Sequence, residues 1–201
     1  MNSRTEDQLR SAGLQVCGSC AGMSRRGAQL LRNAALLEDL TVAEADVLGG
    51  AMLLLRARPG QVLIAEGDVG EWMMLLLSGT VDVTKRNLRG EVSRLAVIRQ
   101  GAAIGEMSML DGELRYASCV ALDEVEAGVL TRHAVAQLIR EHPAVGAKLL
   151  VKLTQMMAQR LRNTSNQLIK LLNGAPLPFD LGDAAAPVPS AVSAPQGREQ
   201  L

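Results

Sequence analysis

Aromatic residues are nearly absent from this chain of 201 residues, which contains one tryptophan, one tyrosine and one phenylalanine. Hydrophobic residues still make up 48% of the sequence, so the predicted core is aliphatic and rich in methionine. An excess of charge is also missing, because 21 basic residues balance 21 acidic ones. A global electrostatic attraction to nucleic acid is therefore not favoured.

Cysteine and histidine are scarce as well. The three cysteines, Cys17, Cys20 and Cys119, are an odd number that offers no disulfide framework and suits a reducing cytoplasm. An iron–sulfur cluster needs four thiolates, and His133 and His142 have no carboxylate or cysteine neighbours at ligand spacing, so we expect no metal site. No nucleophile–base arrangement is visible, so we do not expect an enzyme.

Signals for secretion or membrane insertion are lacking too. The N-terminus "MNSRTEDQLR" is charged and has no apolar h-region. The apolar runs "MLLLR" and "WMMLLL" are far shorter than the roughly 20 residues that span a bilayer. These features predict a cytoplasmic protein.

The chain divides by composition into an arm, a domain and a tail. Residues 1–27 are polar and rich in glycine and serine, and we expect a flexible arm. Leucines recur at helical spacing from Ala28 to Leu40, and Thr41 is placed to cap a second helix over 42–50. Short β-forming runs separated by turn residues, several of them glycines, then predict strands, at 52–58, 62–67, 72–79, 81–86, 93–99, 118–123 and 126–130.

Helical patterns return after Thr131. One helix is predicted over 132–142, and Pro143 suits the first turn of another that runs to Leu172. This second helix, on the order of 40 Å long, exceeds what the domain can cover, so part of its Leu/Met stripe is expected to contact a second copy in a homodimer. Residues 173–201 are rich in Ala, Pro and Ser and predict a disordered tail.

The predicted fold class is α+β. Seven short strands at nearly regular spacing favour an antiparallel β-roll, similar to a jelly-roll barrel, in a domain over 28–172. N-terminal helices and the long C-terminal helix, over about 143–172, flank this roll.

The stretch "GEMSMLDGELRYAS", residues 105–118, places two isolated charges, Glu106 and Arg115, between apolar strands. A core has no use for an isolated carboxylate and an isolated guanidinium. Arg115 can bind an anion with two parallel hydrogen bonds, and Glu106 can accept hydrogen bonds from sugar hydroxyls. A short helix over "MSML" would add free N–H groups. Such a pocket fits a phosphate ester of a nucleoside.

This stretch resembles the phosphate-binding cassette of cyclic-nucleotide-binding domains, with its Gly-Glu, an apolar turn and then an arginine. "IAEGDVGEWMMLLLSGTVDV", residues 64–83, matches the strands before the cassette, and the resemblance covers about residues 30–172. It implies that Glu106 binds the ribose 2′-hydroxyl and that Arg115 binds the cyclic phosphate. The resemblance assigns further ligand-binding positions around these two, at Gly105, Met107, Ser108, Tyr116 and Ala117.

A second stretch, "MAQRLRNTSNQL" over 157–168, is similar to the dimer helix of bacterial catabolite activator proteins. In those proteins a Thr-Ser pair reaches the adenine, and the serine comes from the partner subunit. Thr164 and Ser165 stand at these places, and their hydroxyls can donate to and accept from adenine. The resemblance therefore implies cyclic AMP and a dimer.

The chain departs from the family pattern in three ways. Leu114 stands where proline usually precedes the arginine, and Tyr116 follows it in place of a small residue. The tyrosine can stack on the base, crowd the phosphate or point into the barrel, and the sequence does not choose. The segment after the long helix is too short for a helix-turn-helix domain, so we expect no direct DNA binding.

Two hypotheses follow. The first is a stand-alone cyclic nucleotide sensor for cyclic AMP, with cyclic GMP as the other candidate ligand, that changes conformation and signals to a partner protein. No cofactor is implied. The alternative is a structural or interaction module whose pocket is degenerate or takes a different ligand.

Overall fold

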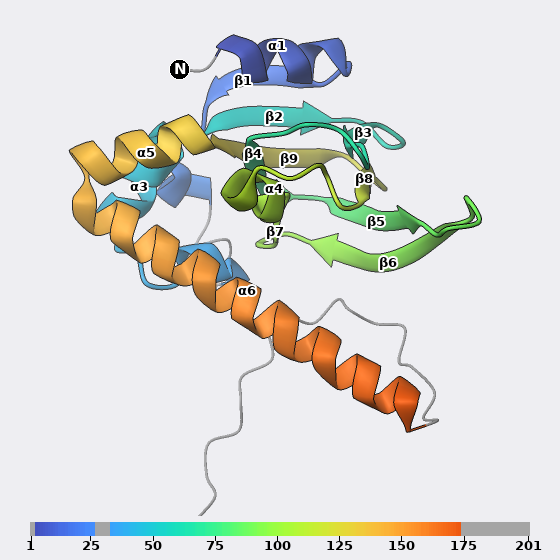
Figure 1. Cartoon of the computed structure of the whole chain (residues 1–201). Coiled ribbons are helices and arrows are strands. Elements are labelled where there is room, and N and C mark those ends of the chain that lie inside the picture. The colour runs from blue at the N-terminus through green and yellow to red at the C-terminus, as the bar shows by residue number, and fades with distance from the viewer. Residues whose placement is uncertain (1–2, 27–32, 174–201) are drawn as a thin grey trace, which may run out of the picture.

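The computed structural model describes residues 3–26 and 33–173, which form two antiparallel sheets, with three of the helices grouped at one side and the N-terminal helix lying over the first strand (Figure 1). One sheet has the strand order β1-β2-β9-β4-β7 and the other has the order β3-β8-β5-β6. The strands are β1 (Gln15–Ser19), β2 (Leu53–Ala57), β3 (Val62–Ile64), β4 (Trp72–Ser78), β5 (Thr80–Arg86), β6 (Val92–Arg99), β7 (Ala103–Ile104), β8 (Ser118–Ala121) and β9 (Val125–Thr131). The helices are α1 (Ser3–Ser11), α3 (Val42–Gly50), α4 (Glu106–Asp111), α5 (Arg132–Glu141) and α6 (Pro143–Leu172), with short 3₁₀ turns η1 (Met23–Arg26) and η2 (Ala35–Leu37).

Strand β4 explains why the sequence carries the unbroken run "WMMLLL". The strand pairs with β9 on one edge and with β7 on the other, so it is central in its sheet. Met73, Leu75 and Leu77 pack with α3, α5 and α6, whereas Trp72, Met74 and Leu76 pack inside the roll. Because both faces are buried, alternation between apolar and polar residues is absent. All seven predicted strands are confirmed, and the roll with flanking helices agrees with the predicted fold class.

The N-terminal segment differs from the predicted flexible arm. Within residues 3–26, α1 is followed by β1, which pairs antiparallel with β2. Leu9 and Leu14 are almost fully buried and join the core of the roll. No apolar pattern predicts this burial, because Leu9 is the one large apolar residue in "SRTEDQLRS". The prediction of an unstructured arm is therefore wrong for these residues.

The helix predicted up to Leu40 is also corrected. Residues 27–32 of that segment lie outside the described residues, and the backbone at Ala34 is extended, with φ −87° and ψ 104°. Only the single 3₁₀ turn η2 follows. The next prediction is confirmed: Thr41 begins α3 with a capping box, in which Thr41 and Glu44 exchange side-chain to backbone hydrogen bonds of 2.8 and 3.3 Å.

Helix α6 runs from Pro143 to Leu172, as predicted, and its 30 residues span roughly 45 Å. Its first half packs on the domain through Val145, Leu149 and Leu153. Two lysines of this half form ion pairs with the segment over η2 and α3. Lys148 pairs with Glu44 at 2.7 Å, and Lys152 pairs with Glu38 at 2.6 Å and with Asp39 at 3.1 Å.

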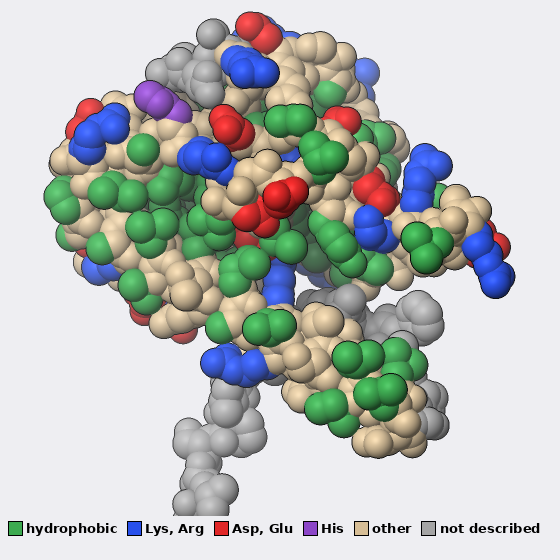
Figure 2. Space-filling model, in the orientation of Figure 1, with side chains coloured by type: hydrophobic (Ala, Val, Ile, Leu, Met, Phe, Trp, Pro, Cys, Tyr) green, Lys and Arg blue, Asp and Glu red, His purple; other side chains and the backbone are tan. Residues whose placement is uncertain are grey.

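The second half of α6 projects past the sheets (Figure 1). Apolar side chains gather on its surface (Figure 2), where Leu161, Leu168, Ile169, Leu171 and Leu172 are all more than half exposed. The disordered tail predicted over 173–201 lies outside the described residues, apart from Asn173, which caps the end of α6. None of the helices in the described ranges is both long and apolar enough to cross a membrane.

Candidate ligand-binding site

The site begins where β7 turns into α4. Gly105 makes this turn with a φ of +75°, a conformation that glycine adopts without strain. A Cβ at Gly105 would also lie 2.7 Å from Nη1 of Arg115 and 2.9 Å from Cδ1 of Ile64, so the position has no room for a side chain. The helical turn predicted over "MSML" is confirmed as α4.

Glu106, the first residue of α4, has a side chain only 1% exposed. Its Oε1 forms an ion pair with Nη1 of Arg160 on α6, and Nη2 of Arg160 donates to the carbonyl oxygen of Ala103 at 2.9 Å. The other carboxylate oxygen, Oε2, is buried and has no hydrogen-bond partner among the described residues. A buried acceptor without a donor is costly, so Oε2 is a ready acceptor for a hydroxyl or amine.

Arg115 lies on the other side of Gly105 and is 3% exposed. Its Nη1 donates to the carbonyl oxygen of Gly105 and its Nη2 to that of Trp72, both at 2.7 Å. The guanidinium lies over the Trp72 ring, 4.1 Å from the ring centre. Burial lowers the pKa of Arg115 to about 10, which leaves it charged at neutral pH. Among the described residues no carboxylate forms an ion pair with it, so the site presents a buried cation beside a buried acceptor.

The rest of the cassette is held from two directions. The backbone of Arg115 pairs with the loop after β3, donating to the carbonyl of Asp68 at 2.9 Å and accepting from the N–H of Gly67 at 2.8 Å. Arg132, at the start of α5, donates to the carbonyls of Ser108 and Met109 at 3.2 and 2.6 Å. These contacts join the cassette to the loop after β3 and to the first residue of α5.

The remaining predicted cassette residues occupy different environments. Ser108 is buried in the first turn of α4, whereas the side chain of Met107 is partly exposed. Tyr116 is 58% exposed, and its ring packs under Nζ of Lys85 on β5, 4.5 Å from the ring centre. Of the three possibilities left open for Tyr116, pointing into the barrel is thus excluded. Leu114 is exposed and Ala117 is half-buried.

The two predicted base-reading residues lie on the exposed part of α6. Thr164 follows Arg160 by four residues, which places it about 40° around the helix axis and about 6 Å further along. It therefore shares the helix face that meets Glu106. Ser165 is turned about 140° from Arg160, so it faces away from the site of its own chain. Helix geometry therefore places Thr164 on the face of α6 that carries Arg160 and turns Ser165 away from that face.

Sequence reasoning missed Arg160 and Trp72, which hold the two central charges of the site. The position of Arg160, one helical turn before Thr164, was the available signal for the first. Trp72 lies 43 residues before Arg115, and nothing local in the sequence links them.

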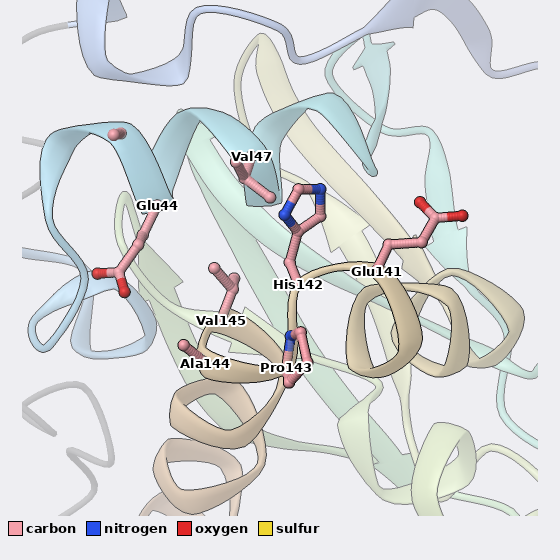
Figure 3. Close-up of a pocket in the computed structure, with 8 residues that line it drawn as sticks. Glu44, Val47, Glu141, His142, Pro143, Ala144 and Val145 are labelled. Atoms are coloured by element: carbon pink, nitrogen blue, oxygen red, sulfur yellow. The ribbon is translucent and has the colours of Figure 1, made fainter.

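A hollow elsewhere in the molecule does not take part in this site (Figure 3). It lies between α3 and the junction of α5 and α6, where Glu44, Val47, His142 and Val145 line it. Of its two carboxylates, Glu44 is already paired with Lys148, and Glu141 accepts a hydrogen bond from Gln137 at 3.0 Å. Within residues 3–26 and 33–173, no three histidine, cysteine or acidic side chains converge as a metal site would require.

Comparison with known proteins identifies the family to which this fold and site are similar. The family model for the cyclic nucleotide-binding domain matches residues 54–142, which include the cassette. A solved cyclic nucleotide-binding domain from Methylobacillus flagellatus superposes with a TM-score of 0.69 and 32% sequence identity, covering 78% of this chain and 88% of that one. The chain belongs to the cyclic nucleotide-binding domain family.

Curated relatives extend this comparison. The chain is 35% identical over 109 residues to the cyclic AMP receptor protein of Thermus thermophilus, a match covering 54% of this chain and 49% of that protein. It is 30% identical over 113 residues to a CRP-like cAMP-activated global transcriptional regulator of Mycobacterium tuberculosis, covering 56% of this chain and 49% of that protein. The chain thus spans about half the length of the curated relatives it matches.

Proposed function

We propose that this protein is a sensor that binds cyclic AMP at the cassette over 105–118 and changes conformation on binding. One observation carries the proposal: among the described residues, a buried guanidinium without an ion-pair partner and a buried carboxylate oxygen without a donor flank the same glycine. A ligand that brings an anion and a hydroxyl together satisfies both groups. Relatives named for cyclic AMP support the choice of ligand.

The two charged residues, Arg115 and Glu106, bind different parts of the nucleotide. A 3′,5′-cyclic phosphate carries one negative charge and leaves the neighbouring ribose 2′-hydroxyl free. Arg115 binds the phosphate oxygens, and Oε2 of Glu106 accepts the hydrogen bond of the 2′-hydroxyl. Gly105 lies between the two groups, and its lack of a side chain lets the Arg115 guanidinium pack directly against this turn.

The base and the dimer depend on α6. Thr164 lies on the face of α6 that meets the cassette of its own chain. Ser165 faces away from that cassette, so in a dimer through α6 it would lie toward the ligand bound to the other copy. The exposed leucines of the projecting half supply an apolar face for that second copy. We therefore propose a homodimer through α6, with Thr164 and Ser165 reading adenine from the two chains.

The conformational change follows from the Glu106–Arg160 ion pair, which links the cassette to α6. A nucleotide seated on Glu106 contacts the same carboxylate as Arg160, so it stabilises some positions of α6 more than others. The ligand can shift the equilibrium between the positions of α6 by no more than the difference in its binding free energy for them. The moving helix then carries the signal to a partner protein.

The alternative, an interaction module with a degenerate pocket, has one observation in its favour. Arg115 is already engaged by two carbonyls and a ring, and it is almost completely buried. In that case the exposed face of α6 is the functional part of the molecule.

Isothermal titration calorimetry with cyclic AMP and cyclic GMP separates the two. We expect saturable binding near one ligand per chain, tighter for cyclic AMP. Arg115→Ala should weaken binding at least about 30-fold, because the desolvated phosphate loses its charged partner. Arg94→Ala, which removes a surface arginine paired with Asp82, is the matched control and should bind as the wild type does. No heat with either nucleotide, or wild-type affinity in Arg115→Ala, would contradict the proposal.

A further inference from the structure

In the described part of the chain, the hydrogen-bond and ring partners of the buried Arg115 guanidinium are neutral groups. Its neighbours within hydrogen-bond or stacking distance are the carbonyls of Gly105 and Trp72 and the Trp72 ring. Trp72 itself is 4% exposed at the start of β4. With only 3% of Arg115 exposed, an anion from solvent reaches the guanidinium only after the guanidinium moves. The contacts with Trp72 therefore stabilise a withdrawn position of Arg115.

Helix α1 reaches the same tryptophan. Nε2 of Gln8 donates to the carbonyl of Val69 at 3.0 Å. Oε1 of Gln8 accepts from Nε1 of Trp72 at 3.5 Å. Leu9, the next residue of α1, packs in the same core cluster as Trp72. One carboxamide thus bridges the tryptophan and the loop before it.

That loop forms a wall of the slot that holds Arg115. Gly70 follows Val69, and a Cβ at Gly70 would lie 2.3 to 2.5 Å from Arg115 Nη2, Nε and Cζ. The guanidinium therefore fits between Gly70 and Gly105, with Trp72 beneath it. By fixing Val69 and Trp72, Gln8 fixes two sides of this slot from a helix outside the family match over 54–142.

We propose that Trp72 and Gln8 are positioning residues that hold Arg115 away from the phosphate site, so that α1 sets the affinity for the ligand. The inference rests on the proposed function, because it concerns the same arginine. The smaller the fraction of molecules in the binding-competent conformation, the weaker the observed affinity for the ligand. Weakening the withdrawn position therefore tightens ligand binding.

Trp72 supplies its own signal, because it is the one tryptophan of the chain. Titrating the full chain with cyclic AMP while recording heat and tryptophan emission follows binding and the Trp72 environment together. We expect the emission to change and to saturate at the midpoint of the heat, since the cation leaves the ring. Saturable heat with unchanged emission would overturn the inference and leave the proposed function standing. Absence of both signals would overturn both.

Variants give the second readout. Trp72→Leu removes the ring and should tighten cyclic AMP binding roughly tenfold, and Trp72→Phe, which keeps a weaker aromatic face, should lie between it and the wild type. Unchanged or weaker binding in a folded Trp72→Leu protein would overturn the inference.

Gln8→Ala keeps the test open if Trp72 variants do not fold, because Gln8 is an exposed residue on the surface of α1. We expect roughly threefold tighter binding and an altered Trp72 emission before ligand is added. Asp7→Ala, on the same helix and without a side-chain partner among the described residues, is the matched control. Equal affinity and emission in the Gln8 and Asp7 variants would overturn the role of α1.

Discussion

Removing Arg160 tests the link between the cassette and α6. In the structure Glu106 is 1% exposed and Arg160 is its one charged partner within ion-pair distance among the described residues, whereas the arginine side chain keeps 47% exposure. Breaking a fully buried pair by deleting one partner costs about 3 to 5 kcal/mol. Because solvent reaches Arg160 and already screens part of this interaction, we expect Arg160→Ala to lower the free energy of unfolding by about 2 to 3 kcal/mol.

Urea denaturation followed by circular dichroism measures this change. Arg162→Ala, an exposed arginine two residues further along α6, is the matched control and should alter stability by less than about 0.5 kcal/mol. Adding Glu106→Gln to Arg160→Ala should recover at least about 1 kcal/mol, since a neutral amide is cheaper to bury than an unpaired carboxylate. The reasoning is refuted if Arg160→Ala costs no more than the control, or if the second substitution lowers stability further.

Three further predictions concern other parts of the molecule. Gly70→Ala should destabilise the fold by about 1 to 3 kcal/mol in urea, because its methyl group collides with the Arg115 guanidinium; unchanged stability would mean that the slot is loose. Hydrogen bonds from Lys148 lower the pKa of Glu44 from 4.5 to about 2, so its stabilising effect is complete above pH 4.5 and is lost as the pH falls toward 2. Unfolding free energies measured down this range should fall less steeply for Glu44→Gln than for the wild type, and equal slopes would contradict the assignment. Leu168→Glu should convert the proposed dimer to a folded monomer in sedimentation equilibrium; a monomeric wild type or a dimeric variant would count against α6 as the interface.

Much of the fold could be predicted because its signals are local. Each of the seven predicted strands is a short β-forming run bounded by turn residues, and α6 is long and begins at Pro143. The elements that were missed lack such signals. Strand β7 has only two residues, too few to show a period, and α1 carries a single leucine whose burial depends on the roll beneath it. Their formation is decided by tertiary packing.

The candidate site, like the fold, could be predicted only in part. Glu106 and Arg115 stand out in the sequence because two charges interrupt an apolar region, and the cassette pattern gives their spacing. Their partners do not stand out, because Arg160 meets Glu106 only through the path of α6 past β7, and Trp72 meets Arg115 only through the pairing of distant loops. These contacts join residues 54 and 43 positions apart, beyond the reach of any helical or strand period.

The most direct test of nucleotide binding at this cassette is a calorimetric comparison of cyclic AMP with 2′-deoxy cyclic AMP, on the wild type and on Glu106→Ala. The wild type should bind cyclic AMP roughly tenfold to a hundredfold more tightly than the deoxy analogue, the range expected for a hydrogen bond to a buried carboxylate. Glu106→Ala should bind the two nucleotides nearly equally. A wild type that does not distinguish them, or a variant that distinguishes them as well as the wild type does, would contradict the account.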